Sequence, residues 1–460
     1  MTRNVRQSIG VQCFSAVTKS LFKQYVTTTT FHGYKYLGEN GLHWTERLFW
    51  LTVCMISIVA SIFLMKASWY DFQNNALSFV VDTNYLEWDT KFPSISVCET
   101  DNQDKIASAS DRLFGDPHDY NLDEVMKEML FFRGLSYYTI QTCESEENVD
   151  NCLVTNVNVY EYLVRSTCKE IFLECKWNDN PFNCCKYFTA LHTELGPCYA
   201  INSLQARDKK APYLPLISNK KFGPGRLTLK LRGTLSLYIM GEQDVPSITT
   251  LPKDILEVSP YIHYRRYISV KEIENEKQVR FTSVEQRKCR FIDENYLDVY
   301  EYYSYSACTT QCRKDAQFQK CNCTHHLMPN THNGKICDVD GLHCLHDNYN
   351  DIAVLKAVWA NRNGLVCECL PSCTEVEITT IRESEEGILD PYAIVDISLE
   401  SLPTERFKRN VVRGKLELVV SLGGAAALLL GASLLSVFEF FYFFLLRVFN
   451  TARMVKKVHS

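Results

Sequence analysis

The stretch LVVSLGGAAALLLGASLLSVFEFFYFFLL, residues 418–446, decides how this chain is organised. It carries one formal charge, Glu439, and exceeds the ~20 apolar helical residues that cross a bilayer core. Small residues recur at Ser421, Gly424, Ala427 and Gly431, a spacing that places them on one face of a helix. Such a face either packs closely against neighbouring membrane helices or lines a pore, and the periodicity alone favours packing.

A second apolar segment, residues 48–65, is uncharged and readily extends to Tyr70. It is just long enough to span a bilayer, and Trp44, Trp50 and Trp69 lie near its ends, where aromatic rings favour the membrane interface. No apolar run long enough for a signal peptide precedes it, so a cleavable leader is not expected. The sequence therefore predicts membrane helices at residues 48–70 and 415–446.

The charges flanking these two segments predict their orientation. Residues 1–47 are net basic, and residues 447–460 contain basic side chains but no acidic ones. Because basic flanks remain on the cytoplasmic side, both flanking segments are expected in the cytoplasm and residues 71–414 outside the cell. Neither span has regularly spaced arginines, which argues against a voltage sensor.

The cysteine content supports the same orientation. The chain has 20 cysteines, and all except Cys13 and Cys54 lie between Cys98 and Cys373. A block of this kind indicates disulfides formed in an oxidising compartment. Zinc binding is the competing interpretation, but the one-residue spacing of Cys321-x-Cys323 and Cys367-x-Cys369 fits zinc sites poorly. No metal or cofactor is therefore expected, and a net charge of −5 gives no reason to expect nucleic-acid binding.

Two motifs at opposite ends of the chain point to one family. Gly423-Gly424, then Gly431-Ala432-Ser433, Leu435-Ser436 and Glu439, resemble the second membrane segment of the degenerin/epithelial sodium channel superfamily. The pair His32-Gly33, shortly before the first span, resembles that family's gating motif at the cytoplasmic pore mouth. One departure is Ala427, where many members have a third glycine.

Motifs between the two spans extend the resemblance. Residues 92–98, FPSISVC, and residues 196–202, GPCYAIN, resemble conserved elements of the family's extracellular domain. The cysteine spacing from Cys308 to Cys373 resembles its disulfide-laddered thumb, and residues 287–291, RKCRF, are most like the insect pickpocket branch. Period-two alternation also predicts strands at residues 227–231 and 235–239.

The resemblance implies an α+β membrane protein with two transmembrane helices flanking a large disulfide-rich extracellular domain. That domain would have a β-rich core and a helical thumb, and the channel would be a trimer. The implied disulfides, in which nested spacing agrees with the family pattern, are Cys98–Cys198, Cys168–Cys175, Cys289–Cys373, Cys308–Cys369, Cys312–Cys367, Cys321–Cys344 and Cys323–Cys337. Cys143, Cys152, Cys184 and Cys185 remain unassigned. Asn322-Cys323-Thr324 is the only N-glycosylation sequon, and its use is left open.

By resemblance, the chain is a pore-forming subunit of a trimeric sodium channel that is gated through its extracellular domain by a ligand, protons, proteolysis or force. Gly431, Ala432 and Ser433 would form the selectivity filter, and His32, Gly33 and Val420 would act in gating. Ser421, Gly424, Ala427, Ser436 and Glu439 would line the pore, although Glu439 could equally pair with a polar group of a neighbouring helix. The expected partners are sodium ions, related channel subunits and the lipid bilayer.

Other functions fit the sequence less well. An accessory, non-conducting subunit of a heteromeric channel is the nearest alternative. An ATP-gated channel with two spans would lack the Gly-Ala-Ser string and the thumb cysteine spacing. A tethered ecto-enzyme would need catalytic carboxylates and a phosphate-binding loop, whereas the chain has no P-loop or GxGxxG motif, and His325-His326 has no carboxylate at helical spacing. No catalytic residue is therefore predicted.

Overall fold

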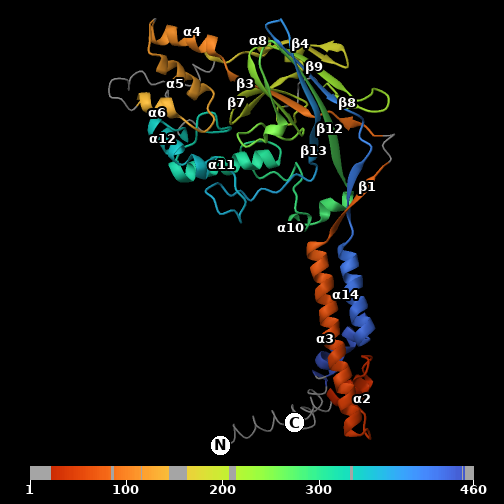
Figure 1. Cartoon of the computed structure of the whole chain (residues 1–460). Coiled ribbons are helices and arrows are strands. Elements are labelled where there is room, and N and C mark those ends of the chain that lie inside the picture. The colour runs from red at the N-terminus through yellow and green to blue at the C-terminus, as the bar shows by residue number, and fades with distance from the viewer. Residues whose placement is uncertain are drawn as a thin grey trace, which may run out of the picture. The chain divides into compact units, whose positions relative to one another are not determined.

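The computed structural model describes residues 22–83, 88–115, 117–143, 163–206, 214–331, 335–447 and 449–450 (Figure 1). The chain divides into two compact units. The membrane unit comprises residues 1–78 and 411–460, and the disulfide-rich unit comprises residues 79–410. The fold is mixed α+β, as the sequence predicted.

Helices build the membrane unit. Residues 22–28 are helical, and the elements that follow are α2 (Tyr34–Gly38), α3 (Trp44–Asn74), α14 (Lys415–Leu430), α15 (Leu434–Phe441) and the π-helical turn η7 (Tyr442–Arg447). Figure 1 shows α3 and α14 side by side, and the two helices pack against each other. Large apolar side chains such as Ile56, Phe63 and Leu428 are exposed along them.

One helix in the described part of the chain, α3, is by itself long and apolar enough to cross a membrane. It extends beyond both ends of the predicted span. The second candidate is a bent pair, Lys415–Leu430 followed by Leu434–Arg447, with a bend of 72° at residues 431–433. The predicted second segment is thus helical on both sides of its Gly-Ala-Ser string and interrupted at that string.

Two large β-sheets form the centre of the disulfide-rich unit. The 8-stranded sheet has the order β1-β15-β12-β14-β9-β4-β5, and β13 also pairs with β12. β12 runs parallel to β14 and β15 and antiparallel to β13. The strands are β1 (Leu77–Asp82), β4 (Phe172–Trp177), β5 (Asn180–Phe182), β9 (Arg226–Leu231), β12 (Ile262–Asn275), β13 (Val376–Gly387), β14 (Ala393–Leu399) and β15 (Arg406–Val411).

The 5-stranded sheet has the order β11-β10-β3-β7-β6. Its strands are β3 (Ser94–Asp101), β6 (Thr189–Thr193), β7 (Gly196–Ile201), β10 (Thr234–Met240) and β11 (Ile255–Val258). The two strands predicted by alternation are β9 and β10, and they belong to different sheets. Their buried residues meet in one core cluster, in which Leu227 and Leu229 of β9 join Leu235 and Leu237 of β10. The alternating leucines therefore hold the two sheets together.

Helices gather beside these sheets (Figure 1). α4 (Gln103–Phe114), α5 (Tyr120–Leu130) and α6 (Tyr137–Cys143) pack with α11 (Tyr305–Cys321), α12 (Val339–Asp347) and α13 (Tyr349–Ile352). Buried Ile106, Met126, Met129 and Leu342 belong to a second apolar core there. The shorter elements are β2 (Thr90–Lys91), β8 (Ile217–Ser218), α8 (Cys168–Ile171), α9 (Cys184–Tyr187), η4 (Pro252–Asp254), η5 (Lys277–Phe281) and α10 (Val284–Arg287).

Eight disulfides join the described residues, and six have the pairing implied by the family resemblance. Cys98–Cys198 bridges directly opposed residues of β3 and β7. The other five, in the thumb, are Cys289–Cys373, Cys308–Cys369, Cys312–Cys367, Cys321–Cys344 and Cys323–Cys337. Cys308 and Cys312 lie one turn apart on α11, so both sulfurs reach the same returning segment.

The expected Cys168–Cys175 pairing is wrong. Cys168 pairs with Cys185 and Cys175 pairs with Cys184, with Cα separations of 5.8 Å and 5.5 Å. Cys168 opens α8, and the chain is extended from Phe172 onward, so the strand carries Cys175 about 10 Å beyond Phe172. That path separates the first two cysteines, whereas the adjacent pair in α9 presents one sulfur to each segment. Cys184 and Cys185, two of the four cysteines left unassigned, therefore have partners. Cys143 and Cys152 stay unassigned, and Cys152 lies outside the described residues.

Candidate pore site

The interruption between α14 and α15 begins at Gly431. This residue has a positive φ of 67°, which L-residues other than glycine adopt reluctantly. Its N–H donates to the Ala427 carbonyl at 3.0 Å and closes the last turn of α14. A Cβ added at Gly431 would lie 2.5 Å from Cδ2 of His32, so the backbone and the neighbouring ring both require glycine.

Ser433 starts the next helix. Its hydroxyl accepts a hydrogen bond from the Ser436 N–H, and the Ser436 hydroxyl accepts one from the Ser433 N–H, each at 3.2 Å. This reciprocal capping box satisfies backbone donors that a new helix would otherwise leave unpaired. The three residues predicted as the filter, Gly431, Ala432 and Ser433, are therefore the three non-helical residues between α14 and α15.

The His32-Gly33 pair lies against this interruption. The His32 N–H donates to the Leu430 carbonyl at 2.9 Å, which satisfies one carbonyl left free at the end of α14. Gly33 has a φ of 82°, and a Cβ there would lie 2.9 Å from Sγ of Cys54 on α3. The Cys54 thiol in turn lies 3.9 Å from the His32 carbonyl oxygen. The turn at residues 31–33 thus contacts both long helices, and two motifs far apart in the sequence form one site.

Thr30 connects the same turn to α15. Its hydroxyl lies 2.7 Å from the Ser436 hydroxyl and donates to Oε2 of Glu439 at 3.2 Å. The Thr30 N–H also points to this carboxylate oxygen, at 3.4 Å. Glu439 is thus hydrogen-bonded to the N-terminal segment of its own chain, and its roles in the pore or in pairing with a neighbouring helix stay predictions. Thr30 and Cys54 were not predicted as site residues, because neither belongs to a recognisable motif.

The prediction that Ser436 lines the pore requires correction. Its side chain is 1% exposed because Thr30 and Ser433 cover it. A residue enclosed within its own chain presents no surface to an ion path. Of the other predicted wall residues, Gly424 and Ala427 are exposed and Ser421 is half-buried, while the gating candidate Val420 is 64% exposed. The small-residue face of α14 is therefore largely uncovered by the described part of the chain.

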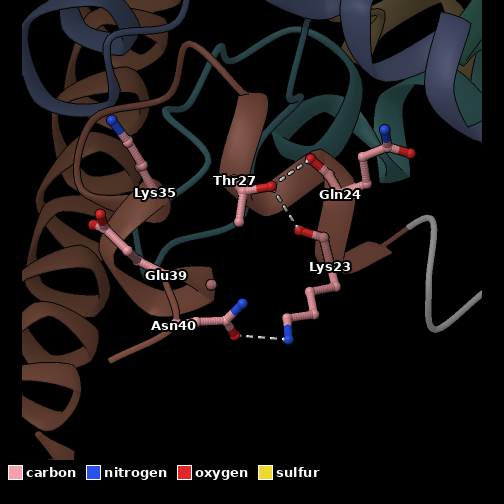
Figure 2. Close-up of a pocket in the computed structure, with 7 residues that line it drawn as sticks. Lys23, Gln24, Thr27, Lys35, Glu39 and Asn40 are labelled. Carbon is pink, nitrogen blue, oxygen red and sulfur yellow. Dashed lines mark hydrogen bonds between the residues drawn. The ribbon is translucent and has the colours of Figure 1, made fainter. Parts of the chain in front are cut away.

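The N-terminal segment is anchored on both sides of the His32 turn. Tyr25, in the helical residues 22–28, packs edge-on against Phe443 at a ring separation of 5.5 Å. Figure 2 shows a polar pocket beside the same helical residues, where Nζ of Lys23 donates to Oδ1 of Asn40, after the turn, at 2.9 Å. The Thr27 hydroxyl in this pocket donates to carbonyls of its own helix. These contacts hold the ends of the segment that carries His32.

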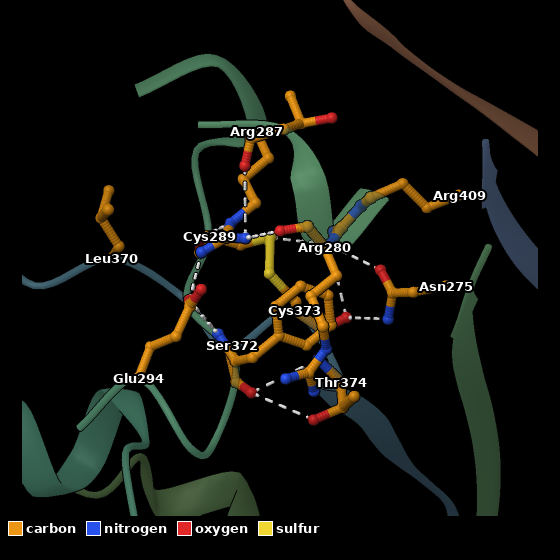
Figure 3. Close-up of a disulfide and its surroundings, with 12 residues drawn as sticks. Asn275, Arg280, Arg287, Cys289, Glu294, Leu370, Ser372, Cys373, Thr374 and Arg409 are labelled. Carbon is orange, nitrogen blue, oxygen red and sulfur yellow. Dashed lines mark hydrogen bonds and ion pairs between the residues drawn. A yellow bond between two sulfur atoms is a disulfide. The ribbon is translucent and has the colours of Figure 1, made fainter. Parts of the chain in front are cut away.

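A second structural junction lies in the disulfide-rich unit, around Cys289–Cys373 (Figure 3). The buried guanidinium of Arg409, on β15, donates from Nη1 to Sγ of Cys289 at 2.8 Å and to Oδ1 of Asn275 at 3.2 Å. Asn275, on β12, donates to the Cys373 carbonyl at 2.8 Å. Burial lowers the pKa of Arg409 from its ordinary value. The base of the thumb is thus tied to two strands, and the chain continues from β15 into α14.

In the described residues, no group of three or more His, Cys, Asp or Glu side chains is arranged to hold a metal ion. The candidate pore site instead offers hydroxyl groups and backbone carbonyls, with one carboxylate at Glu439. Oxygen ligands of this kind can replace part of the hydration shell of a small cation when several copies converge.

Comparisons with known proteins match nearly the whole chain. The family model described as amiloride-sensitive sodium channel matches residues 25–443, a range that includes both the His32 turn and the Gly431 interruption. The sodium channel protein Nach of Drosophila ananassae is 22% identical over 93% of this chain and 86% of its own length. Pickpocket protein 28 of Drosophila melanogaster is 20% identical, over 97% and 82%. Acid-sensing ion channel 2 of Rattus norvegicus is 23% identical, over 59% and 56%.

Proposed function

Because this chain belongs to the amiloride-sensitive sodium channel family, we propose that it is a pore-forming subunit of a trimeric, sodium-selective cation channel without a voltage sensor. Membership in this family and similarity to its insect Nach and pickpocket members confirm the resemblance drawn from the motifs. The family consists of ion channels, so the ecto-enzyme alternative is excluded. The observation that carries the proposal is the contact of His32 with Gly431 at the interruption of the second apolar segment.

The proposed topology has two spans, α3 and the bent α14–α15 pair, with both ends of the chain in the cytoplasm and residues 71–414 outside the cell. The eight disulfides of the described residues support an oxidising location for the middle of the chain. Two helices cannot enclose a water-filled path, so several copies must assemble around it. The exposed Gly424 and Ala427 suit such an assembly because small residues allow backbones or ions to come close.

Selectivity is proposed to arise at residues 431–433. With three copies around an axis, carbonyl and hydroxyl oxygens of this interruption would set the diameter of the narrowest ring. The positive φ of Gly431 and the capping box of Ser433 fix the local backbone. The His32 turn would pack against each interruption and limit how far the ring of oxygen atoms can widen.

Gating is proposed to act on the upper part of α14. The family resemblance implies a small residue eleven positions before the filter glycine, where a bulkier residue would hold the pore open. That position here is Val420, which is exposed in the single chain. We expect Val420→Gly to lower any resting current at equal surface level, and an unchanged or larger resting current would reject this role. The stimulus is proposed to reach α14 through the disulfide-rich unit, because β15 leads directly into α14.

The test of the proposed function is ion selectivity after substitution of Ser433. The chain is expressed alone and with related subunits, and reversal potentials are measured while Na⁺ is replaced by K⁺. We expect Ser433→Ala to raise the relative permeability to K⁺, and Ser433→Thr, which keeps a capping hydroxyl, to remain closer to the parent. Variants that reach the surface with unchanged reversal potentials would place the filter elsewhere. Current that survives only with other subunits, and that no Ser433 variant alters, would indicate an accessory subunit.

A further inference from the structure

One exposed residue lies at the end of α11, between two disulfide-bonded cysteines. Asn322 is the C-cap of that helix, with a φ of 57°, and it follows Cys321 and precedes Cys323. Its backbone N–H donates to the Phe318 carbonyl at 3.0 Å, whereas its side chain is exposed. With Thr324, it forms the only Asn-x-Ser/Thr sequon of the 460-residue chain. The location of the sequon in the fold therefore bears on whether it is used.

The folded chain exposes the asparagine but conceals the threonine that a glycosyltransferase must also recognise. Thr324 is 2% exposed, and its hydroxyl donates to Oγ1 of Thr331 at 3.2 Å. Its backbone is clamped as well, because its N–H donates to the Lys335 carbonyl and its carbonyl accepts from the Cys337 N–H, each at 2.9 Å. These backbone contacts adjoin the Cys323–Cys337 disulfide. The glycosyltransferase can therefore recognise the sequon only before this segment folds. The exposed Asn322 side chain nevertheless leaves room for a glycan on the folded surface.

We propose that Asn322 is an N-glycosylation site whose occupancy is determined by competition with closure of the Cys323–Cys337 disulfide. In the transfer, Nδ2 of Asn322 forms a bond to the anomeric carbon of an oligosaccharide carried on a lipid pyrophosphate. The bond from that carbon to the pyrophosphate oxygen breaks, the pyrophosphate leaves with the electron pair, and one amide proton passes to a base of the transferase. The proposal rests on the extracellular location of residues 71–414 given under Proposed function.

The competition follows from chain order. Cys337 lies 14 residues after Cys323, so at ~5–20 residues per second it emerges about 1–3 s later. A loop this short costs little entropy to close, and the Cys321–Cys344 bridge then adds a second constraint on the other side of Asn322. The chain is therefore expected as a mixture of glycosylated and unglycosylated forms. A glycan at Asn322 also requires this end of α11 to face solvent in the assembled channel, because a subunit contact could not enclose it.

The experiment follows the full chain expressed in cells with a secretory pathway, with electrophoretic mobility compared before and after peptide-N-glycosidase treatment. We expect a fraction of the parent chain to lose the mass of one glycan, and Asn322→Gln to show no such shift. Cys337→Ser keeps the sequon but removes the partner of Cys323, so it should raise the glycosylated fraction. The matched control Cys369→Ser breaks a thumb disulfide farther from the sequon and should leave that fraction unchanged.

A positive control separates this proposal from the topology on which it rests. Phe281→Asn creates a second sequon with Thr282 and Ser283, at a residue that is 82% exposed in the same unit. A glycan on this variant, with none on Asn322 in the parent chain or in Cys337→Ser, would overturn the proposal while leaving the topology intact. Equal occupancy of Asn322 in the parent and in Cys337→Ser would overturn the competition. Absence of a glycan from every variant, Phe281→Asn included, would overturn both the site and the extracellular assignment.

Discussion

At the scale of single residues, Gly431 is required for two separate reasons, and a matched control can test both. Alanine there would hold a left-handed backbone, at a cost of about 1–2 kcal/mol, and would press on the His32 ring. We expect Gly431→Ala to reduce whole-cell current strongly at equal surface expression. Gly423→Ala is the control, because a Cβ at Gly423 meets no atom of the described part of the chain within 4 Å. Equal currents in the two variants would contradict the role given to the His32 contact.

Thr30 supports a prediction about gating that is distinct from selectivity. Thr30→Val keeps the side-chain shape but leaves the buried Ser436 hydroxyl and the Glu439 carboxylate with one partner fewer. The Ser436 hydroxyl keeps its contacts with Ser433, so the loss should amount to about 0.5–1.5 kcal/mol, the net value of a typical hydrogen bond. We expect altered open probability in single-channel records with an unchanged reversal potential.

The matched control for this change is Thr28→Val, because among the described residues the Thr28 hydroxyl donates to carbonyls of its own helix alone, at Gln24 and Tyr25. The open probability of Thr28→Val should equal that of the parent. If Thr28→Val and Thr30→Val alter open probability equally, the effect comes from the N-terminal helix and not from the contact with α15.

The sequence predicted the members of this site but not how they meet. His32, Gly33 and residues 431–433 were each recognised from a local motif. Their contact joins segments separated by most of the chain, and no periodicity encodes a pairing of that kind. Thr30 and Cys54 act through one hydroxyl and one thiol placed by that contact, so they had no local signature. For Ser436, the family resemblance implied a pore wall, but the N-terminal segment that covers it could not be anticipated from α15 alone.

At the scale of elements, the segment after α11 carries a buried histidine, His325, and a half-buried one, His326, which should make the helical region sensitive to acid. Burial is the main cause that lowers the pKa of both, to about 4 for His326 and well below the ordinary value for His325. The nearby positive charges Arg313 and Arg165 act in the same direction, on His325 and His326 respectively. Nε2 of His326 also contacts the Met129 carbonyl of α5 at 2.5 Å. A neutral imidazole therefore joins α5 to the thumb.

The sign of the pH effect follows from these lowered pKa values. A histidine whose folded pKa lies below its unfolded value of about 6.5 binds more protons when unfolded, so stability falls as the pH drops below 6.5. We expect the melting temperature of the purified full chain to decrease between pH 6.5 and 4. His326→Gln keeps an N–H donor for the Met129 carbonyl and cannot become charged, so its decrease should be smaller. An identical decrease in melting temperature with pH for parent and variant would show that other groups dominate the acid response.

The disulfides show how far cysteine spacing and the family resemblance together can predict contacts between elements. The thumb pairs were implied by the family pattern, and the structure agrees because α11 places Cys308 and Cys312 on one face and the chain returns beside it. The pairs of α8, β4 and α9 were not, because adjacent cysteines such as Cys184 and Cys185 can serve two partners in either order. The choice between them depends on the turn of α9 and the direction of β4, which are features of the folded chain.

At the scale of the whole molecule, the proposed topology can be tested without any current. We expect an epitope tag at the N-terminus to stain only permeabilised cells, and a tag near residue 120, which is exposed on α5, to stain intact cells. The basic residues that flank the two spans predict this outcome, because they should remain on the cytoplasmic side. Staining of the N-terminal tag on intact cells would reverse the orientation and with it the extracellular assignment of the disulfide-rich unit.

Assembly decides whether the small-residue face of α14 is adhesive or lines the ion path, because the single chain leaves it open in either case. Ala427 and Leu428 are both exposed in the isolated chain, so burial within one subunit does not distinguish them. Around a central pore, however, Ala427 should face water and Leu428, on the next helical position, should face lipid or a neighbouring helix.

We expect a charged, membrane-impermeant thiol reagent to reduce the current of Ala427→Cys and to leave the current of Leu428→Cys unchanged. The native Cys54 is buried against the His32 turn, and the parent chain, which keeps all its own cysteines, serves as the background control for both variants. If Ala427→Cys is insensitive to the reagent although it reaches the surface and conducts, the small residues of α14 pack helices together and the pore is lined by another face.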